Sequence, residues 1–461
     1  MSRDILENIS TLLAEGKLAD LREQLCDMNV VDIAQAMESL PEDELLRIFR
    51  ILPKDISADV FSYLEPDSQA QLLNLITDTE LENLLDDMFL DDTVDIIEEM
   101  PANVVKKILK STKPEKRAEI NKFLAYPDNS AGSIMTPEFL DLRLGMTVNQ
   151  SLERIRKIGD YKETVNCCYI LDSTKHLVGV LTIKELLLAK PDTVVDTIME
   201  TNVIFTSTHT DQEEVSSIIK KYDLLSIPVV DAEERMVGIV TIDDIIDVIE
   251  DEATEDIQKM AAITPTDTPY LKTPVWRIWL NRVPWLLLLM ISATFTGLII
   301  NANEETLNLP VVGIILTGCI PMIMDTGGNA GSQASVTVIR GIALGEINIK
   351  DIFKVIWKEL RVAFLLGATL MVACFCKLML IDQLYKVENG FIIAIVICLT
   401  IFCTIMIAKF IGCTLPLIAK VCHLDPAVVA SPFITTIVDA VSLSIYCSLA
   451  IAILGNLYPM I

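Results

Sequence analysis

The feature that most restricts the fold is a series of apolar segments that begins at Val283. A helix needs about 20 apolar residues to cross the hydrocarbon core of a bilayer, and most of these segments approach that length. The sequence therefore predicts a transmembrane domain with five helical spans in residues 276–461. The five segments lie at residues 283–300, 309–324, 362–381, 391–408 and 426–457.

Charge is divided very unevenly along the chain. Residues 275–461 hold only 11 of the 37 Lys and Arg and 10 of the 64 Asp and Glu, so 26 basic and 54 acidic residues precede them. An acidic surface repels phosphate, which argues against nucleic acid as a partner and favours cations.

The flanks of the apolar segments predict their orientation. Basic residues such as Arg277, Arg282 and Arg361 lie at alternate ends of successive segments, and basic residues mark the cytoplasmic side of a membrane. We therefore expect a multi-pass protein of the cytoplasmic (inner) membrane, with the amino-terminal regions in the cytosol and the carboxyl terminus outside. The start, MSRDILENIS, does not resemble a signal peptide, and the 11 cysteines, which form no CxxC pair, are interpreted as buried apolar residues.

The first region repeats every twelve residues between residues 28 and 124. Pairs of apolar residues recur at this period, and prolines interrupt several units, which rules out one long helix. Short helices stacked as a solenoid explain the pattern, because each unit buries its apolar pair against its neighbours. We expect an acidic, all-α solenoid over residues 1–130.

The second region contains a tandem repeat. SIMTPEFLDLRLGMTVNQSLERIRK (133–157) returns loosely as TIMETNVIFTSTHTDQEEVSSIIKK (197–221), and YILDSTKHLVGVLTIKELL (169–187) returns as PVVDAEERMVGIVTIDDII (228–246). Each copy predicts strand, helix, strand, strand and helix. We expect two α/β domains over residues 131–250, followed by an acidic connecting helix within residues 243–275.

Asp439 stands alone in an otherwise uncharged run of the last apolar segment. A carboxylate at the centre of a membrane helix costs about 2.5–3.5 kcal/mol on insertion scales. It could pair with a basic residue of another span, where Lys377 and Lys409 are the candidates, or it could be protonated. The third interpretation is that it faces a water-filled path and binds a cation there.

Two further motifs favour such a path. PMIMDTGGNAGSQAS (321–335) combines glycines with polar side chains, and we expect irregular backbone there because glycine permits close approach to a ligand. In the last span, Pro432 is expected to free a backbone carbonyl. The residues predicted to line the pore are Ser431, Pro432, Thr435, Thr436, Gly327, Gly328 and Asn329.

These groups offer oxygen donors without thiolate or imidazole. Oxygen ligands suit Mg²⁺, Ca²⁺ or Mn²⁺, and Mg²⁺ keeps several waters while binding one or two carboxylates. One Asp makes a poor cage, so we expect two copies of the chain to bring two Asp439 residues together.

The tandem repeat resembles a pair of CBS domains, with the Thr-x-x-Asp pattern at Thr241 and Asp244 and Glu185 in the first copy. Together with the solenoid, the spans, DTGGNAGSQ and DPAVVASPFITTIVD, the whole chain resembles the MgtE family of magnesium channels. The resemblance implies a homodimer with one central pore, Mg²⁺ uptake that serves magnesium homeostasis, closure by cytosolic Mg²⁺, and modulation by ATP at Thr241 and Asp244.

The resemblance also implies metal-binding residues. Asp439 corresponds to the pore aspartate and Asp425 to the aspartate of the DP motif. The sensor residues would be Asp59, Asp91, Asp95, Glu213, Asp223, Asp244, Asp247, Glu252, Glu255 and Asp256. Ser431 departs from the asparagine that often precedes the proline in this family.

Two other function classes were weighed. An ion-coupled secondary transporter of Mg²⁺, Mn²⁺ or Co²⁺ could also use broken helices, although the five spans contain no evident inverted repeat. A membrane enzyme is disfavoured because the sequence offers no nucleophile–base set, Gly-x-Ser-x-Gly motif or phosphate loop.

Overall fold

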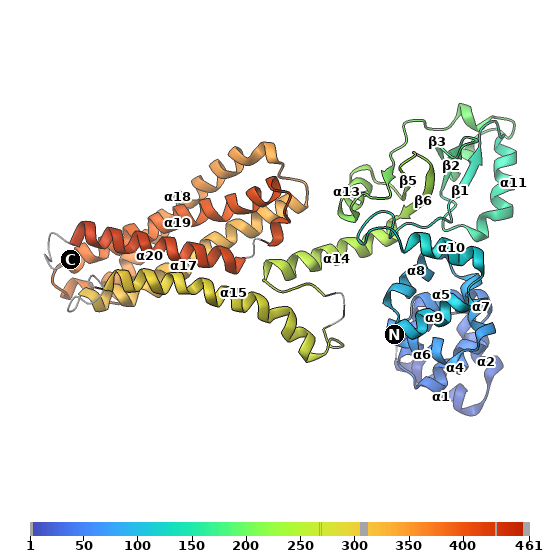
Figure 1. Cartoon of the computed structure of the whole chain (residues 1–461), viewed down its shortest axis with the longest axis horizontal. Helices are drawn as coiled ribbons and strands as arrows, with labels where there is room; N and C mark the ends of the chain where they lie inside the picture. Colours follow the sequence, from blue (N-terminus) through green and yellow to red (C-terminus); the bar gives the residue numbers. More distant parts are fainter. Residues whose placement is uncertain (1–2, 267, 269, 305–311, 429–430, 455–461) are drawn as a thin grey trace. The chain divides into compact units, whose positions relative to one another are not determined.

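The computed structural model describes residues 3–266, 268, 270–304, 312–428 and 431–454. The chain forms two compact units, Met1–Ile249 and Glu250–Ile461, which are described separately below (Figure 1).

The first unit begins with ten short helices. They are α1 (Arg3–Glu15), α2 (Leu18–Cys26), α3 (Val30–Glu38), α4 (Glu42–Ile51), α5 (Lys54–Ser62), α6 (Pro66–Leu75), α7 (Asp78–Asp87), α8 (Leu90–Glu99), α9 (Ala102–Ser111) and α10 (Pro114–Phe123). From α3 to α10 every helix starts twelve residues after the previous one, which confirms the predicted repeat. Pro41, Pro53 and Pro101 immediately precede helices, and Pro66 and Pro114 open them, where a missing N–H leaves no helical hydrogen bond unmade.

Alternate helices of the solenoid pack together. Helix α5 contacts α3 and α7, while α4 contacts α6 and α8 contacts α10. The repeated apolar pairs, such as Val60 with Phe61 and Leu72 with Leu73, are buried in the core between them. Burying these pairs holds the solenoid together, since each short helix would be marginal alone.

The tandem repeat forms two small α/β domains with the predicted element order. The first contains β1 (Leu140–Arg143), α11 (Val148–Ile158), η1 (Gly159–Tyr161), β2 (Cys167–Leu171), β3 (Leu177–Thr182) and α12 (Ile183–Leu188), followed by η2 (Val195–Thr197). The second contains β4 (Thr206–Ser207), α13 (Gln212–Tyr222), β5 (Ser226–Val230), β6 (Met236–Thr241) and α14 (Ile242–Met260). Each sheet has a parallel pair followed by an antiparallel pair, in the orders β1-β2-β3 and β4-β5-β6.

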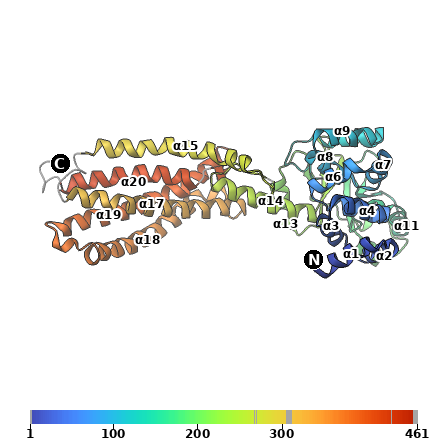
Figure 2. The same cartoon turned by 90° about the horizontal axis from the view of Figure 1, so that it is seen from below.

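The second unit consists mainly of long helices that run side by side (Figure 2). They are α15 (Val275–Ala302), α17 (Val312–Ala343), α18 (Ile352–Leu380), α19 (Gly390–Val421) and α20 (Ser431–Leu454), with short turns η3 (Ile349–Asp351), η4 (Leu384–Lys386) and η5 (Pro426–Val428) between them. Within the described residues, four helical segments are long and apolar enough to cross a membrane: 275–302, 349–380, 390–421 and 432–454. Helix α17 does not meet this criterion, so the count of five spans stays a prediction.

Helix α19 lies at the centre of the bundle, where it contacts α17, α18 and α20. The glycines of α17 allow close helix packing. A Cβ atom at Gly327 would lie 2.6 Å from Thr404 of α19, and one at Gly328 would lie 2.6 Å from Thr435 of α20. Small residues at such positions are what membrane helices use to approach one another.

Two expectations about the backbone were wrong. Helix α17 continues through Gly327 and Gly328 without a break, because neighbouring helices fill the space beside them. Asp325 therefore lies inside a long helix and not at a helix end. Pro432 is the second residue of α20 and frees no carbonyl within the helix, since the first turn has no acceptor upstream. Helix α14 agrees with the expected acidic helix: it ends at Met260, and the first membrane helix begins at Val275.

Candidate cation sites

Asp439 lies in the first half of α20 and is half-buried. Its Oδ1 atom is buried and has no hydrogen-bond partner among the described residues. Asp325 of α17 is close enough for its negative charge to act on Asp439. A buried carboxylate oxygen without a donor is costly, and a second carboxylate nearby increases that cost, so this position favours a cation.

The two lysines considered as partners of Asp439 are engaged elsewhere. Lys409 Nζ lies 3.5 Å from Glu359 Oε2, and Lys377 Nζ lies 2.6 Å from Asp382 Oδ2. Within the described residues, the interpretation of Asp439 as half of an interhelical ion pair is therefore not supported.

The hydroxyl groups near Asp439 are partly occupied. Thr436 Oγ1 donates to the Pro432 carbonyl at 3.0 Å, a bond inside α20. Thr435 Oγ1 and Ser332 Oγ are 3.4 Å apart and connect α20 to α17. The side chain of Ser431 lies outside the part of the chain that the structure describes.

Helix α17 carries an exposed polar stripe. Asp325, Asn329 and Gln333 are four residues apart, so they lie on one face, and all three are exposed, whereas Gly327 and Gly328 are buried. Such side chains are costly against lipid tails. The stripe must therefore face water or protein. Of the three residues of α17 that were predicted to line the pore, Asn329 lies in this stripe, whereas Gly327 and Gly328 do not.

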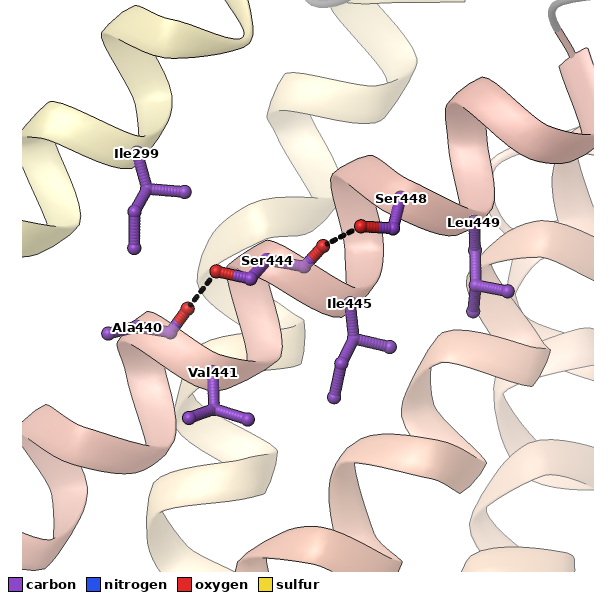
Figure 3. A pocket seen from close by; sticks show the side chains of 7 residues that line it. All are labelled: Ile299, Ala440, Val441, Ser444, Ile445, Ser448 and Leu449. Carbon is purple, nitrogen blue, oxygen red and sulfur yellow. Dashed lines mark hydrogen bonds between the residues drawn. The ribbon is translucent and has the colours of Figure 1, made fainter.

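A cavity of about 470 Å³ beside α20 does not suit an ion (Figure 3). It is lined mainly by apolar side chains, together with Ser444 and Ser448. Both hydroxyls donate to carbonyls of their own helix, Ser444 to Ala440 at 2.9 Å and Ser448 to Ser444 at 2.7 Å. Among the described residues, no carboxylate lines the cavity, so these residues have no negative charge to offer a cation.

In the first unit, carboxylates from the solenoid and the α/β domains gather closely. Burial and the charges of Asp92, Glu163, Glu138 and Asp244 raise the pKa of Asp91 to about 8. The Oδ1 atom of Asp91 is buried without a hydrogen-bond partner among the described residues. This carboxyl group therefore sits in a position where a proton or a metal cation would be stabilising.

Neighbouring carboxyl groups show the same shift. Asp95 lies on an exposed part of α8. Even so, desolvation by the surrounding protein and the charges of Asp92, Glu98 and Asp244 raise its pKa to about 7. Burial, then Asp244 and Asp92, raise the pKa of Glu163 to about 7. The mutual repulsion shows that this region is under electrostatic strain when all its carboxylates are ionised.

The other predicted sensor residues are placed less tightly. Asp59, Asp223, Asp247 and Glu213 are exposed. Asp223 caps the carboxyl end of α13 with a left-handed backbone, and Glu213 lies in the first turn of that helix. Glu252 is half-buried in α14. Within the described residues, no three His, Cys, Asp or Glu side chains meet as a group that could hold one metal ion.

A separate cluster lies at the end of α14 in the second unit. Lys259 Nζ contacts both Glu255 Oε1 and Asp425 Oδ2 at 2.7 Å. Burial and the charge of Asp425 raise the pKa of Asp256, while Lys259 and Arg340 oppose the shift. Two predicted metal-binding carboxylates, Glu255 and Asp425, therefore contact one ammonium group, whose charge also acts on Asp256.

The two residues predicted to bind nucleotide contact each other. Thr241 Oγ1 donates to Asp244 Oδ2 at 2.6 Å, immediately before and within the first turn of α14. Thr182 and Glu185 form a full capping box at the equivalent helix α12. The Thr-x-x-Asp/Glu pattern thus places a threonine hydroxyl in contact with a carboxylate at the start of a helix in both copies.

A cavity of about 1150 Å³ in the first unit lies elsewhere. Lys122 and Phe123 of α10 line it together with Arg143 and the β2–β3 turn. Neither Thr241 nor Asp244 lines it. This cavity is therefore distinct from the predicted nucleotide contacts.

Sequence comparison identifies the family. Residues 320–449 match a family model described as a divalent cation transporter, MgtE. Residues 28–129 match the MgtE intracellular N domain, and residues 131–192 and 195–251 match CBS domains. The magnesium transporter MgtE of Thermus thermophilus is 33% identical over 98% of this chain and 98% of its own length. This chain belongs to the MgtE family.

Two other MgtE proteins support the assignment. The magnesium transporter MgtE of Bacillus subtilis is 32% identical, again over 98% of both chains. A crystal structure of the cytosolic domain of the Mg²⁺ channel MgtE in complex with ATP matches with a TM-score of 0.50 and 35% identity, covering 53% of this chain and 99% of that one. The solenoid and CBS pair are thus an established MgtE arrangement.

Several residues of this MgtE chain were not singled out from its sequence. Asp92, Glu138 and Glu163 join the acidic cluster, and Lys259 joins the cluster at α14. Asp92 follows Asp91 directly and was visible as part of a charge run. Glu138 and Glu163 lie in loops, and no local pattern relates them to the solenoid.

Proposed function

We propose that this chain forms a homodimeric Mg²⁺ channel that mediates Mg²⁺ uptake across the cytoplasmic membrane and closes when cytosolic Mg²⁺ is high. The observation that carries the proposal is Asp439, whose buried oxygen has no described hydrogen-bond partner and which lies near Asp325. Membership of a divalent cation transporter family supports the reaction class.

In this proposal the path runs between α17 and α20. Asp439 and the exposed stripe of Asp325, Asn329 and Gln333 supply oxygen atoms to a hydrated cation. A stripe of this kind would need a second copy or water beside it, so a symmetric dimer would bring two Asp439 carboxylates to one axis. Two carboxylates with retained waters suit Mg²⁺.

Closure would come from the acidic residues outside the membrane. Like charges repel, so acidic surfaces come together only when cations or protons reduce their charge. Changing a gate from 1:99 to 99:1 requires about 5.5 kcal/mol of differential binding. A site with tenfold preference supplies about 1.4 kcal/mol, so about four such sites would be needed per gate, and the ten predicted sensor carboxylates are enough to form them.

ATP modulation belongs to the same proposal. A relative's cytosolic domain has been crystallised with ATP. Asp244 would contribute to two functions here, since it lies in the acidic cluster and in the predicted nucleotide site. We expect nucleotide to change the Mg²⁺ concentration at which the channel closes.

The test is Mg²⁺ flux into liposomes that contain the wild type or Asp439→Ala, with Mg²⁺ varied on the cytosolic face. We expect the wild type to conduct and to close as cytosolic Mg²⁺ rises, and the folded variant to be inactive. Normal flux through Asp439→Ala would refute the pore assignment. Uptake against the gradient, driven by H⁺ or Na⁺, would instead identify a secondary transporter.

A further inference from the structure

Lys259 is the one basic residue of α14, whose other eight charged residues are Asp or Glu. Its ammonium group lies 2.7 Å from Glu255 Oε1 on the same helix and 2.7 Å from Asp425 Oδ2, which lies in the connection between α19 and α20. These are short, charge-assisted contacts. They join the end of α14 to the segment that leads into α20.

Each oxygen of the Asp425 carboxylate accepts a hydrogen bond in this arrangement. Its Oδ1 accepts the Ala427 backbone N–H at 2.8 Å, while Oδ2 accepts from Lys259. The Ala427 contact fixes the orientation of the carboxylate at the start of η5. Lys259 therefore meets a carboxylate that is already held in position.

The ammonium group of Lys259 is surrounded by negative charge. Without it, another cation would be needed to offset the repulsion between these carboxylates. Glu255, Asp256 and Asp425 are all acidic and close together, and Arg340 is the other basic group that acts on Asp256. Without Lys259, approach of α14 to Asp425 would place like charges side by side. Such contact costs free energy until a positive charge lies between the carboxylates.

We propose that Lys259 is a tethered cation that holds the end of α14 against Asp425 in place of a Mg²⁺ ion. This inference rests on the proposed function, in which the sensor carboxylates that close the channel include Glu255 and Asp256 of α14. A tethered ammonium is present at a constant effective concentration, whereas a bound ion depends on cytosolic Mg²⁺. Lys259 thus makes this contact independent of Mg²⁺ and lowers the Mg²⁺ concentration needed to close the channel.

The first experiment compares purified full-length wild type, Lys259→Gln and Lys259→Arg in detergent. Thermal melting is measured in EDTA and then with increasing Mg²⁺. We expect Lys259→Gln to melt earlier in EDTA and to gain more from Mg²⁺ than the wild type, because Mg²⁺ can now occupy the position of the ammonium. Lys259→Arg, which keeps the charge, should behave like the wild type.

The matched control is Lys354→Gln. Lys354 also forms a 2.8 Å ion pair, but its partner is Asp351, three residues before it, and its side chain is exposed. We expect this variant to show no additional stabilisation by Mg²⁺. Equal Mg²⁺ stabilisation of Lys259→Gln and the wild type would refute the proposal.

The double variant Lys259→Gln/Asp425→Asn removes both partners. We expect the extra Mg²⁺ stabilisation of the single variant to disappear, since the new ion would lose one of its ligands. Retention of the full Mg²⁺ effect would show that the ion binds elsewhere and would overturn the proposal. If Lys259→Gln does not fold, Asp425→Asn serves instead, and it should melt earlier in EDTA without recovery in Mg²⁺.

Flux provides the second measurement. In liposomes, we expect Lys259→Gln to need at least about threefold more cytosolic Mg²⁺ for closure, since one closed-state contact now depends on the ion. An unchanged closure midpoint would contradict the proposal. Absence of flux in the wild type would refute the proposed function, while the melting experiment would still test Lys259 by itself.

Discussion

The Lys409 ammonium lies 3.5 Å from the Glu359 carboxylate, and both side chains are largely buried between α18 and α19. Lys409 was one of the two lysines considered as partners of Asp439, and this ion pair engages it with Glu359 instead. Lys409 therefore does not neutralise Asp439, whose negative charge remains available to a cation.

Breaking this pair should be strongly destabilising. We expect Lys409→Met to lower the stability of the membrane unit by about 3–5 kcal/mol, because Glu359 would remain buried without a counter-charge. The double variant Lys409→Met/Glu359→Leu should recover most of the loss. Thermal melting in detergent measures both, and a stable single variant would show that Glu359 is neutral or hydrated.

Gly412 is expected to tolerate no side chain. A Cβ atom there would lie 2.2 Å from the Gly331 carbonyl oxygen, so Gly412→Ala should force α19 and α17 apart at a cost of about 1–3 kcal/mol. Gly318→Ala is the matched control, since no atom lies within 4 Å of its added Cβ. The control should melt at the wild-type temperature or slightly higher. A harmless Gly412→Ala would mean that α17 and α19 are not this close.

Asp325 should increase conduction without being essential. Its charge acts on the region around Asp439, and a negative field raises the local concentration of cations. We expect Asp325→Asn to reduce Mg²⁺ flux in liposomes on the order of tenfold at low ionic strength, and less in high salt. Asp351→Asn, which alters a half-buried carboxylate paired with the exposed Lys354, is the control. Equal flux in the two variants would remove Asp325 from the path.

The acidic cluster predicts that stability depends on pH when divalent cations are absent. The folded-state pKa is about 8 for Asp91 and about 7 for both Asp95 and Glu163, each above the ordinary value of the group. The folded state therefore binds more protons than the unfolded state between about pH 4 and pH 8, and stability falls as pH rises through this window.

We accordingly expect the cytosolic unit to melt at a higher temperature at pH 6 than at pH 8 in EDTA. Asp91→Asn should flatten this dependence, because the carboxyl group with the highest pKa is then absent. Mg²⁺ should reduce the difference between the two pH values by replacing the protons. A melting temperature that rises from pH 6 to pH 8 would contradict the described cluster.

The periodic parts of the fold could be predicted from sequence because their contacts are local. The twelve-residue repeat predicted the helices from α3 to α10 and their buried pairs, and the tandem repeat predicted both α/β domains. Burial of a regular apolar pattern leaves few alternatives for such segments. The family followed from the same motifs and was confirmed by comparison with known MgtE proteins.

The errors arose where neighbouring segments decide the structure. Gly327 and Gly328 were interpreted as a break, yet Thr404 and Thr435 pack against them and the helix continues. Lys259 was overlooked because its significance depends on Asp425, which is 166 residues away in sequence. Glu163 joined the acidic cluster only through folding of the first unit. The site residues themselves remain predictions that the proposed variants test.

Helix α14 also has a mechanical consequence. Its 19 residues form one uninterrupted rod of about 28 Å, with the Thr241–Asp244 bond at its beginning and Lys259 near its end. A tilt of about 5° at the first end would displace the other by about 2.5 Å, which is comparable to the length of an ion pair. A displacement of this size at the Lys259 end would suffice to break its contact with Asp425, without any bending of the helix.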